Sequence, residues 1–264
     1  MAVAAVVAHG TCTESGKMAL FTREALNPGV KPREVWGWAL YDFANSGYTT
    51  VVLTAVFSAY FVGGVANKAD WATLAWTLAL SLSYGIVMLT MPAIGAYADR
   101  HAAKKRLLVM STLSCVVCTA ALSLVPQFSG AAKVAVALGL IVLSNVFYSY
   151  GESLIAAFLP EIAKGEAMGR VSGWGWGLGY VGGMLALGLS LGYVLWAQSQ
   201  SIKADQFVPV TMLITAAVYG LAACFTFAWL KERAVANPQA PSQGGVGRAY
   251  TQLRSTFQKA RHFP

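Results

Sequence analysis

This sequence has few charges for its length. Only 11% of its 264 residues are charged, whereas 56% are hydrophobic. Soluble domains carry roughly 25% charged residues, so the shortage excludes an ordinary soluble protein and indicates an integral membrane protein. The formal net charge is nevertheless +8. The basic residues lie in short segments between apolar runs, which excludes a nucleic-acid-binding role and is typical of a membrane protein.

Histidine and cysteine are also scarce. The three histidines, His9, His101 and His262, lie outside the apolar runs, which removes most histidine-dependent chemistry from the membrane interior. Cys115 and Cys118 have the CxxC spacing of a redox or metal pair, but the surrounding run, STLSCVVCTAALSLV, is apolar. We interpret them as small packing residues and predict no metal site and no cofactor. The sequence has no HExxH or Gly-x-Ser-x-Gly element, so we predict no enzyme.

Six apolar runs are long enough to be transmembrane helices, because a hydrocarbon core needs about 20 apolar residues in a helix. The runs cover residues 35–62, 71–97, 107–125, 134–157, 171–197 and 208–230. Their joins are short, which favours antiparallel neighbours in a compact bundle. The sequence therefore predicts an all-α integral membrane protein with six transmembrane helices.

The basic residues predict its orientation. Of the 19 Lys and Arg residues, 16 lie in the two tails and in the second and fourth loops. By the positive-inside rule, both termini are cytoplasmic. The chain then divides into a cytoplasmic tail (1–34), the bundle (35–230) and a cytoplasmic segment (231–264), whose residues 248–261 have the pattern of an amphipathic helix on the membrane surface. We expect a multi-pass protein of the inner (plasma) membrane.

The first run, VWGWALYDFANSGYTTVVLTAVFSAYFV, carries a polar stripe. Its only formal charge is Asp42. Asn45, Ser46, Thr49 and Thr50 follow at i+3, i+4, i+7 and i+8, which places all five on one helical face. A lone membrane anchor has no use for such a stripe. We therefore expect this face to line a protein interior or a watery cavity.

The fourth run contains the second acid within the spans, Glu152. Four polar residues precede it on the same helical face: Ser144, Asn145, Tyr148 and Ser149. A carboxylate is costly in hydrocarbon and marks a candidate functional site. The fourth helix thus has a polar face of its own.

Two polar stripes that face one cavity would form a binding site for a polar solute, and a carboxylate there could gain and lose a proton during transport. We predict Asp42, Asn45, Tyr148 and Glu152 as the solute- or proton-binding residues. The alternative is that each acid only bonds to a neighbouring helix or lies near the membrane interface.

The fifth run begins GRVSGWGWGLGYVGG. Gly175, Gly179 and Gly183 form a GxxxGxxxG face, which permits tight helix crossing and could act as a sliding surface. Trp174, Trp176 and Tyr180 either line a cavity or belong to an interfacial aromatic belt.

The second run ends MPAIGAYADRHAAKKRLL. Gly95 would let helices approach closely, and Asp99, Arg100 and Lys104 could form a charged latch that gates the cytoplasmic side. An ordinary basic loop would have the same spacing.

This loop resembles the one between the second and third helices of major facilitator superfamily transporters, usually G-x-L-A-D-R-x-G-R-K. Gly95, Asp99, Arg100 and Lys104 match that pattern, and Ala102 stands where the family usually has Gly. WALYDFANSGYTT, AAFLPEIA and GRVSGWGWGLGYVGG more specifically resemble the vacuole-effluxer-like branch, whose fungal member is an autophagy-related amino-acid exporter.

The resemblance implies a secondary transporter with a cavity between two six-helix halves, and it suggests amino acids as the solute. Members have about twelve helices in two related halves, whereas six are predicted here. We therefore expect the amino-terminal half of a transporter, with a small-molecule solute, the lipid bilayer, and a missing carboxy-terminal half or a second copy as partners. The alternative is a non-transporting truncated or regulatory membrane protein that binds a partner.

Overall fold

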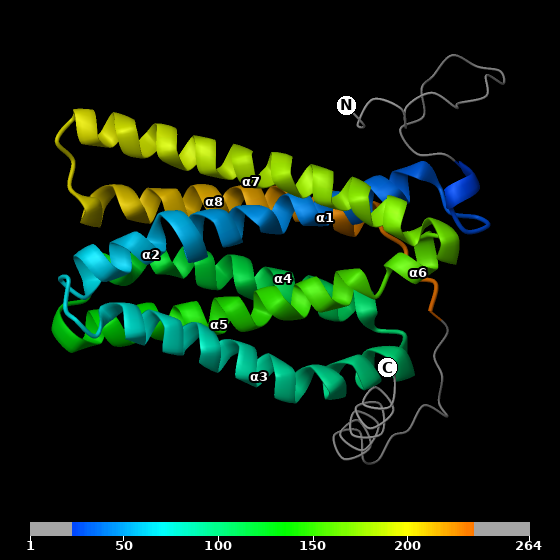
Figure 1. Cartoon of the computed structure of the whole chain (residues 1–264), viewed down its shortest axis with the longest axis horizontal. Helices are drawn as coiled ribbons and strands as arrows, with labels where there is room; N and C mark the ends of the chain where they lie inside the picture. Colours follow the sequence, from blue (N-terminus) through cyan, green and yellow to red (C-terminus); the bar gives the residue numbers. More distant parts are fainter. Residues whose placement is uncertain (1–22, 235–264) are drawn as a thin grey trace, which may run out of the picture.

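A computed structural model describes residues 23–234. Within that range six helices are long and apolar enough to cross a membrane (Figure 1). They cover Pro32–Val65, Ala72–His101, Lys104–Gln127, Gly130–Ile162, Gly165–Ser199 and Ala204–Trp229. Each contains its predicted apolar run to within a residue, which confirms the predicted all-α membrane fold. The predicted amphipathic helix at 248–261 lies outside the described residues.

Several spans are composite. The first joins α1 (Pro32–Gly47), the π-helix η2 (Tyr48–Ala55), α2 (Phe57–Tyr60) and the π-helix η3 (Phe61–Val65). The second is α3 (Ala72–His101), and the third joins α4 (Lys104–Ala121) to η4 (Leu122–Gln127). The fourth contains α5 (Gly130–Ala156) and α6 (Leu159–Ile162). The fifth contains η5 (Gly165–Ala167) and α7 (Met168–Ser199), and the sixth is α8 (Ala204–Trp229). The short helix η1 (Arg23–Ala25) precedes them.

The spans run lengthwise through the bundle (Figure 1). α1 packs against α7 and α8, while α5 packs between α3 and α4. These two groups meet where α4 contacts α8. The α1–α7 pair is the most extensive helix contact in the described chain, and it positions the candidate site described below.

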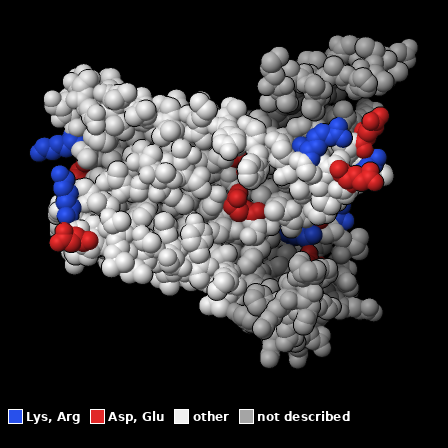
Figure 2. All heavy atoms as spheres, in the orientation of Figure 1, with Lys and Arg blue, Asp and Glu red and all other residues white. Residues whose placement is uncertain are grey.

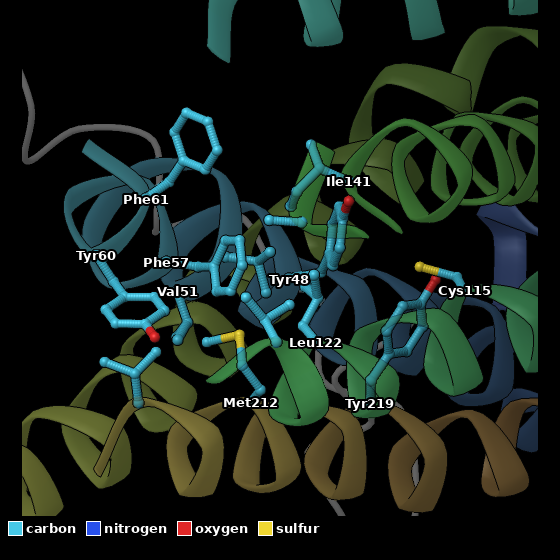
Figure 3. Packing of buried hydrophobic residues seen from close by; sticks show 14 of the residues in the cluster. Tyr48, Val51, Phe57, Tyr60, Phe61, Cys115, Leu122, Ile141, Met212 and Tyr219 are labelled. Carbon is cyan, nitrogen blue, oxygen red and sulfur yellow. The ribbon is translucent and has the colours of Figure 1, made fainter. Parts of the chain in front are cut away.

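Buried aromatic and aliphatic side chains fill the bundle between α1, η2, α4 and α8 (Figure 3). Phe57 and Phe61 both pack against Trp76, with ring centroids 6.2 Å and 5.5 Å apart. Lipid tails are as apolar as these side chains, so helix association in a membrane depends on close packing and on hydrogen bonds between helices.

Several hydrogen bonds join the spans. The Tyr41 hydroxyl lies 2.9 Å from Thr112 Oγ1 and 3.3 Å from the Tyr219 hydroxyl, and all three residues are buried. The Trp38 indole N–H donates to the carbonyl of Ile155 at 3.0 Å. Such bonds are worth on average about 0.6 kcal/mol each in a membrane, and together they fix how the helices are rotated about their axes.

The periodicity of the first span predicted one continuous α-helix, but the structure interrupts it with π-helical segments. From Tyr48 to Ala55 it is π-helical, and the Thr54 hydroxyl donates to the carbonyl of Thr49, five residues earlier. This stretch, YTTVVLTA, is rich in β-branched residues, which are weak α-helix formers. π-Helical turns are rare and are frequent at functional sites. Here the π-helix contains the last two residues of the predicted polar stripe, Thr49 and Thr50.

Ala102 ends α3 in a left-handed conformation, with φ 47° and ψ 51°. A Cβ atom is strained there by about 1–2 kcal/mol, and glycine is not. We therefore expect Ala102→Gly to raise the free energy of unfolding by about 1 kcal/mol. Thermal unfolding of the purified protein in detergent would show this as a higher midpoint. An unchanged or lower midpoint would contradict it.

Candidate functional site

A groove of about 500 Å³ lies between the first span and α7, with one residue from α5 at its wall. Its lining residues are Asp42, Ser46, Thr49, Thr50, Glu152, Trp176, Gly179, Tyr180, Gly183, Met184 and Leu187. Figure 2 shows acidic atoms halfway along the bundle, surrounded by uncharged atoms. Both acids that were predicted from their position inside the spans, Asp42 and Glu152, thus reach one groove.

Asp42 is half-buried in this groove. Within the described part of the chain its carboxylate has neither a hydrogen-bond donor nor an ion-pair partner. It lies close to the backbone of α7, because a Cβ atom at Gly179 would be only 2.9 Å from Asp42 Oδ2 and 3.0 Å from Ser46 Oγ. Gly179 therefore leaves the space that these two polar side chains occupy.

The three hydroxyl groups that the first span contributes to the groove are bonded to the backbone of their own helix. Ser46 Oγ donates to the carbonyl of Asp42 at 2.7 Å. Thr49 and Thr50 donate to the carbonyl of Ser46 at 3.0 Å and 2.7 Å. Each hydroxyl hydrogen is thus used inside the helix, so these oxygens offer the groove only their acceptor lone pairs.

Asn45 lies behind the groove rather than in it. Its side chain is buried, and its amide Nδ2 donates a hydrogen bond to Glu152 Oε1. This bond joins α1 to α5 across the bundle. Asn45 therefore orients the Glu152 carboxylate, which is half-buried and lines the groove.

Most of the predicted stripe on the fourth run holds helices together instead of lining the groove. Tyr148 stacks on Tyr48, with ring centroids 5.0 Å apart and an interplanar angle of 27°. Ser144 lies 2.7 Å from the Tyr48 hydroxyl, and Asn145 donates to Ser83 at 2.6 Å. Of this stripe, only Glu152 is among the lining residues.

The glycine face of α7 packs against the first span. Cβ atoms at Gly175 and Gly183 would lie 2.8 Å from the Trp38 ring and 3.1 Å from Thr50 Oγ1. The closest approach is at a glycine outside the predicted face. A Cβ at Gly182 would overlap the carbonyl group of Phe43. The spacing analysis missed Gly182, although the adjacent pair in YVGG carried the signal.

The predicted latch forms around Lys104. Its ammonium lies 3.4 Å from Asp99, which is largely exposed, and 3.2 Å from Glu161 of α6, which is mostly buried. Within residues 23–234, Arg100 has no hydrogen bond or ion pair. A Cβ at Gly95 would meet no atom within 4 Å, so the close helix approach expected at this glycine is absent from the described structure.

Three charged residues that were not predicted as part of the latch extend this network: Glu34, Glu161 and Arg233. Glu161 also accepts a hydrogen bond from the backbone N–H of Arg233 at 2.9 Å. The Arg233 guanidinium lies 2.7 Å from the buried carboxylate of Glu34 at the start of α1. Together these contacts join α1, α4, α6 and the segment after α8 at one end of the bundle.

Glu232 caps α4. Its carboxylate accepts hydrogen bonds from the backbone N–H groups of Lys104 at 2.7 Å and Lys105 at 3.1 Å. These are the first two residues of the helix, whose N–H groups have no partner within the helix, and an anion is favoured there by the helix dipole.

A family model described as "Vacuole effluxer Atg22 like" matches residues 59–264. The chain belongs to this family. It is also 31% identical over 217 residues to the "Uncharacterized MFS-type transporter YxiO" of Bacillus subtilis (strain 168), an alignment that covers 74% of this chain and 45% of that protein. The chain thus spans about half the length of the curated relative it matches. No solved structure matches it.

In this vacuole effluxer-like chain, Glu161 rather than Asp99 should hold the latch together. We expect Glu161→Gln to lower the free energy of unfolding by about 1–3 kcal/mol, the cost of leaving a partly buried charged partner unsatisfied. Asp99→Asn removes the exposed ion pair and should cost less than about 1 kcal/mol. Thermal unfolding in detergent would compare the two variants. Equal effects would show that the two acids contribute alike.

Proposed function

We propose that this chain forms the amino-terminal half of a secondary transporter for a small polar solute in the inner membrane. The groove would be the side of the solute-binding site that this half contributes. The observation that carries the proposal is the meeting of two acids from within the spans, Asp42 and Glu152, in one groove. Intramembrane carboxylates are costly and typically mark solute or proton pathways. Membership of a family of effluxers supports transport rather than catalysis.

The groove needs a second wall. Trp176 and Tyr180 on its rim are 67% and 70% exposed, beside two carboxylates. A face of this kind is unfavourable toward lipid. In major facilitator transporters a second set of six helices faces the first across the solute site, and the length of the curated relative has room for one. We propose that a carboxy-terminal half or a second copy covers the groove.

The remaining features take roles around this site. The latch of Asp99, Lys104 and Glu161 would close the cytoplasmic side, since it lies at the bundle end from which residues 231–234 leave. The glycine face of α7 would let the fifth span slide on the first. Both termini would be cytoplasmic, and amino acids are the solutes to test first.

Glu152, oriented by Asn45, is the proposed proton carrier, and Glu152→Gln tests it. Leucine uptake would be measured in vesicles from cells that express the complete gene product, with and without an imposed proton gradient. We expect the gradient to stimulate uptake by the natural protein. Glu152→Gln should still exchange leucine but lose most of that stimulation, because an amide cannot release a proton.

Two outcomes would contradict these proposals. Full stimulation of Glu152→Gln by the gradient would remove Glu152 from proton coupling. If neither leucine nor any other amino acid were exchanged, and alanine at both Asp42 and Glu152 left the cellular role of the protein intact, a non-transporting half that binds a partner would replace the transporter.

A further inference from the structure

We infer that the groove recognises a protonated amine, so that the solute carries an alkylammonium group which Asp42 binds directly. This inference rests on the proposed function and specifies its solute class. It follows from the hydrogen-bonding character of the wall that the first span forms, whose side chains accept hydrogen bonds and offer almost none. The donors of the groove, the Trp176 indole N–H and the Tyr180 hydroxyl, come from α7.

The acceptors come from the first span. The hydroxyls of Ser46, Thr49 and Thr50 have given their hydrogens to backbone carbonyls, so their oxygens face a ligand as acceptors. The Asp42 carboxylate adds two acceptor oxygens that no described residue satisfies. An ammonium group has three N–H donors and no acceptor, and it is therefore the complement of this wall.

The charge of the groove points the same way. None of its lining residues is Lys, Arg or His. Asn45 satisfies one oxygen of Glu152 but brings no charge, and Asp42 has no counter-ion within residues 23–234. A partly buried carboxylate is stabilised by a charged, hydrogen-bonded partner, which this half does not supply. A cationic solute supplies both the charge and the donors.

The rim fits the rest of such a solute. Trp176 and Tyr180 present exposed rings beside the carboxylates, and aromatic faces attract ammonium groups within about 6 Å of the ring centroid. Met184 and Leu187 provide an apolar surface for an alkyl chain. The volume of about 500 Å³ suits a small molecule. A carboxylate on the same solute would be repelled by this wall and would have to be held from the opposite side.

The test compares isopentylamine with its neutral derivative N-isopentylacetamide, which keeps the alkyl chain but loses the charge. Both would be titrated into the purified full chain in detergent at neutral pH, with the thermal unfolding midpoint as the readout. We expect isopentylamine to raise the midpoint in a saturable way and the acetamide to leave it unchanged. Sodium chloride at equal ionic strength controls for salt.

Matched variants locate the site. Asp42→Asn should weaken isopentylamine binding at least tenfold, and Glu152→Gln should weaken it to a smaller extent. Asp70→Asn, which neutralises an exposed acid outside the groove, should bind like the natural protein. Having two groove variants keeps the test decisive if one of them fails to fold.

Three results would overturn the inference: equal stabilisation by the acetamide, unchanged amine binding by both groove variants, or stabilisation by sodium that amines do not reproduce. The last would indicate an inorganic cation site. These failures are distinct from failure of the proposed function. If the protein bound amines but moved no solute across vesicle membranes, the amine site would be supported and the transport function contradicted. If it transported solutes that carry no amine, transport would be supported and the amine site contradicted.

Discussion

Gly182→Ala is expected to prevent most of the protein from reaching its folded state. A single added methyl group would overlap the carbonyl of Phe43, and its next neighbours are the Phe43 C and Cα atoms, each 2.7 Å away. These are backbone atoms of α1, so the overlap can be relieved only if α1 and α7 move apart along their contact. Overpacking usually lowers the free energy of unfolding by about 1–3 kcal/mol. Because backbone atoms cannot rotate away as a side chain can, we expect this variant at or above the upper end of that range. The yield of monodisperse protein and its unfolding midpoint in detergent would measure the loss.

Gly177→Ala is the matched control on the same helix. A Cβ there meets no atom within 4 Å, and alanine favours a helix over glycine by up to about 1 kcal/mol. We expect Gly177→Ala to be neutral or stabilising. If the two variants behaved alike, the close contact between α1 and α7 would not be required for folding.

The number and limits of the spans could be predicted because they depend on properties that every residue of a span shares. A stretch must be apolar to lie in lipid and must reach a certain length to cross it. The acids of the site were found for the same reason, since an unusual residue stands out against a uniform background. Asp42 and Glu152 each interrupt an otherwise uncharged run.

What the sequence could not predict depends on which helices lie side by side. The periodicity of the first run placed Asn45 on the same face as Asp42. In the structure the Asn45 amide instead donates a hydrogen bond to Glu152 of the neighbouring α5. Glu161, which pairs with Lys104 in the latch, lies 57 residues from it in the sequence. Glu232, which caps α4 at the Lys104 backbone N–H, lies 128 residues from it. No local pattern encodes such distant pairs. The spacing that predicted close packing at Gly95 shows where a glycine lies but not what faces it, and within the described residues no atom would lie within 4 Å of a Cβ there.

Asp42→Asn is expected to abolish transport by the complete gene product while leaving its insertion in the membrane unchanged. Asparagine has nearly the same shape, so the contact with Gly179 survives, but its amide brings donors to the side of the groove where the first span offers acceptors. Removing one partner of a buried charge pair costs about 2–5 kcal/mol, which is roughly a 30-fold to several-thousand-fold loss of affinity. Leucine flux into vesicles, normalised to the amount of protein in the membrane, would measure it.

Asp70→Asn is the control, because it removes the same charge from an exposed position outside the groove. It should transport at the natural rate, so a loss confined to Asp42→Asn would be due to the groove and not to the net charge. The alternative that Asp42 only joins helices has little support from its contacts, since its carboxylate bonds to no described residue. Normal flux by Asp42→Asn would remove Asp42 from the mechanism, and Glu152 would then be the only groove acid left to bind the solute.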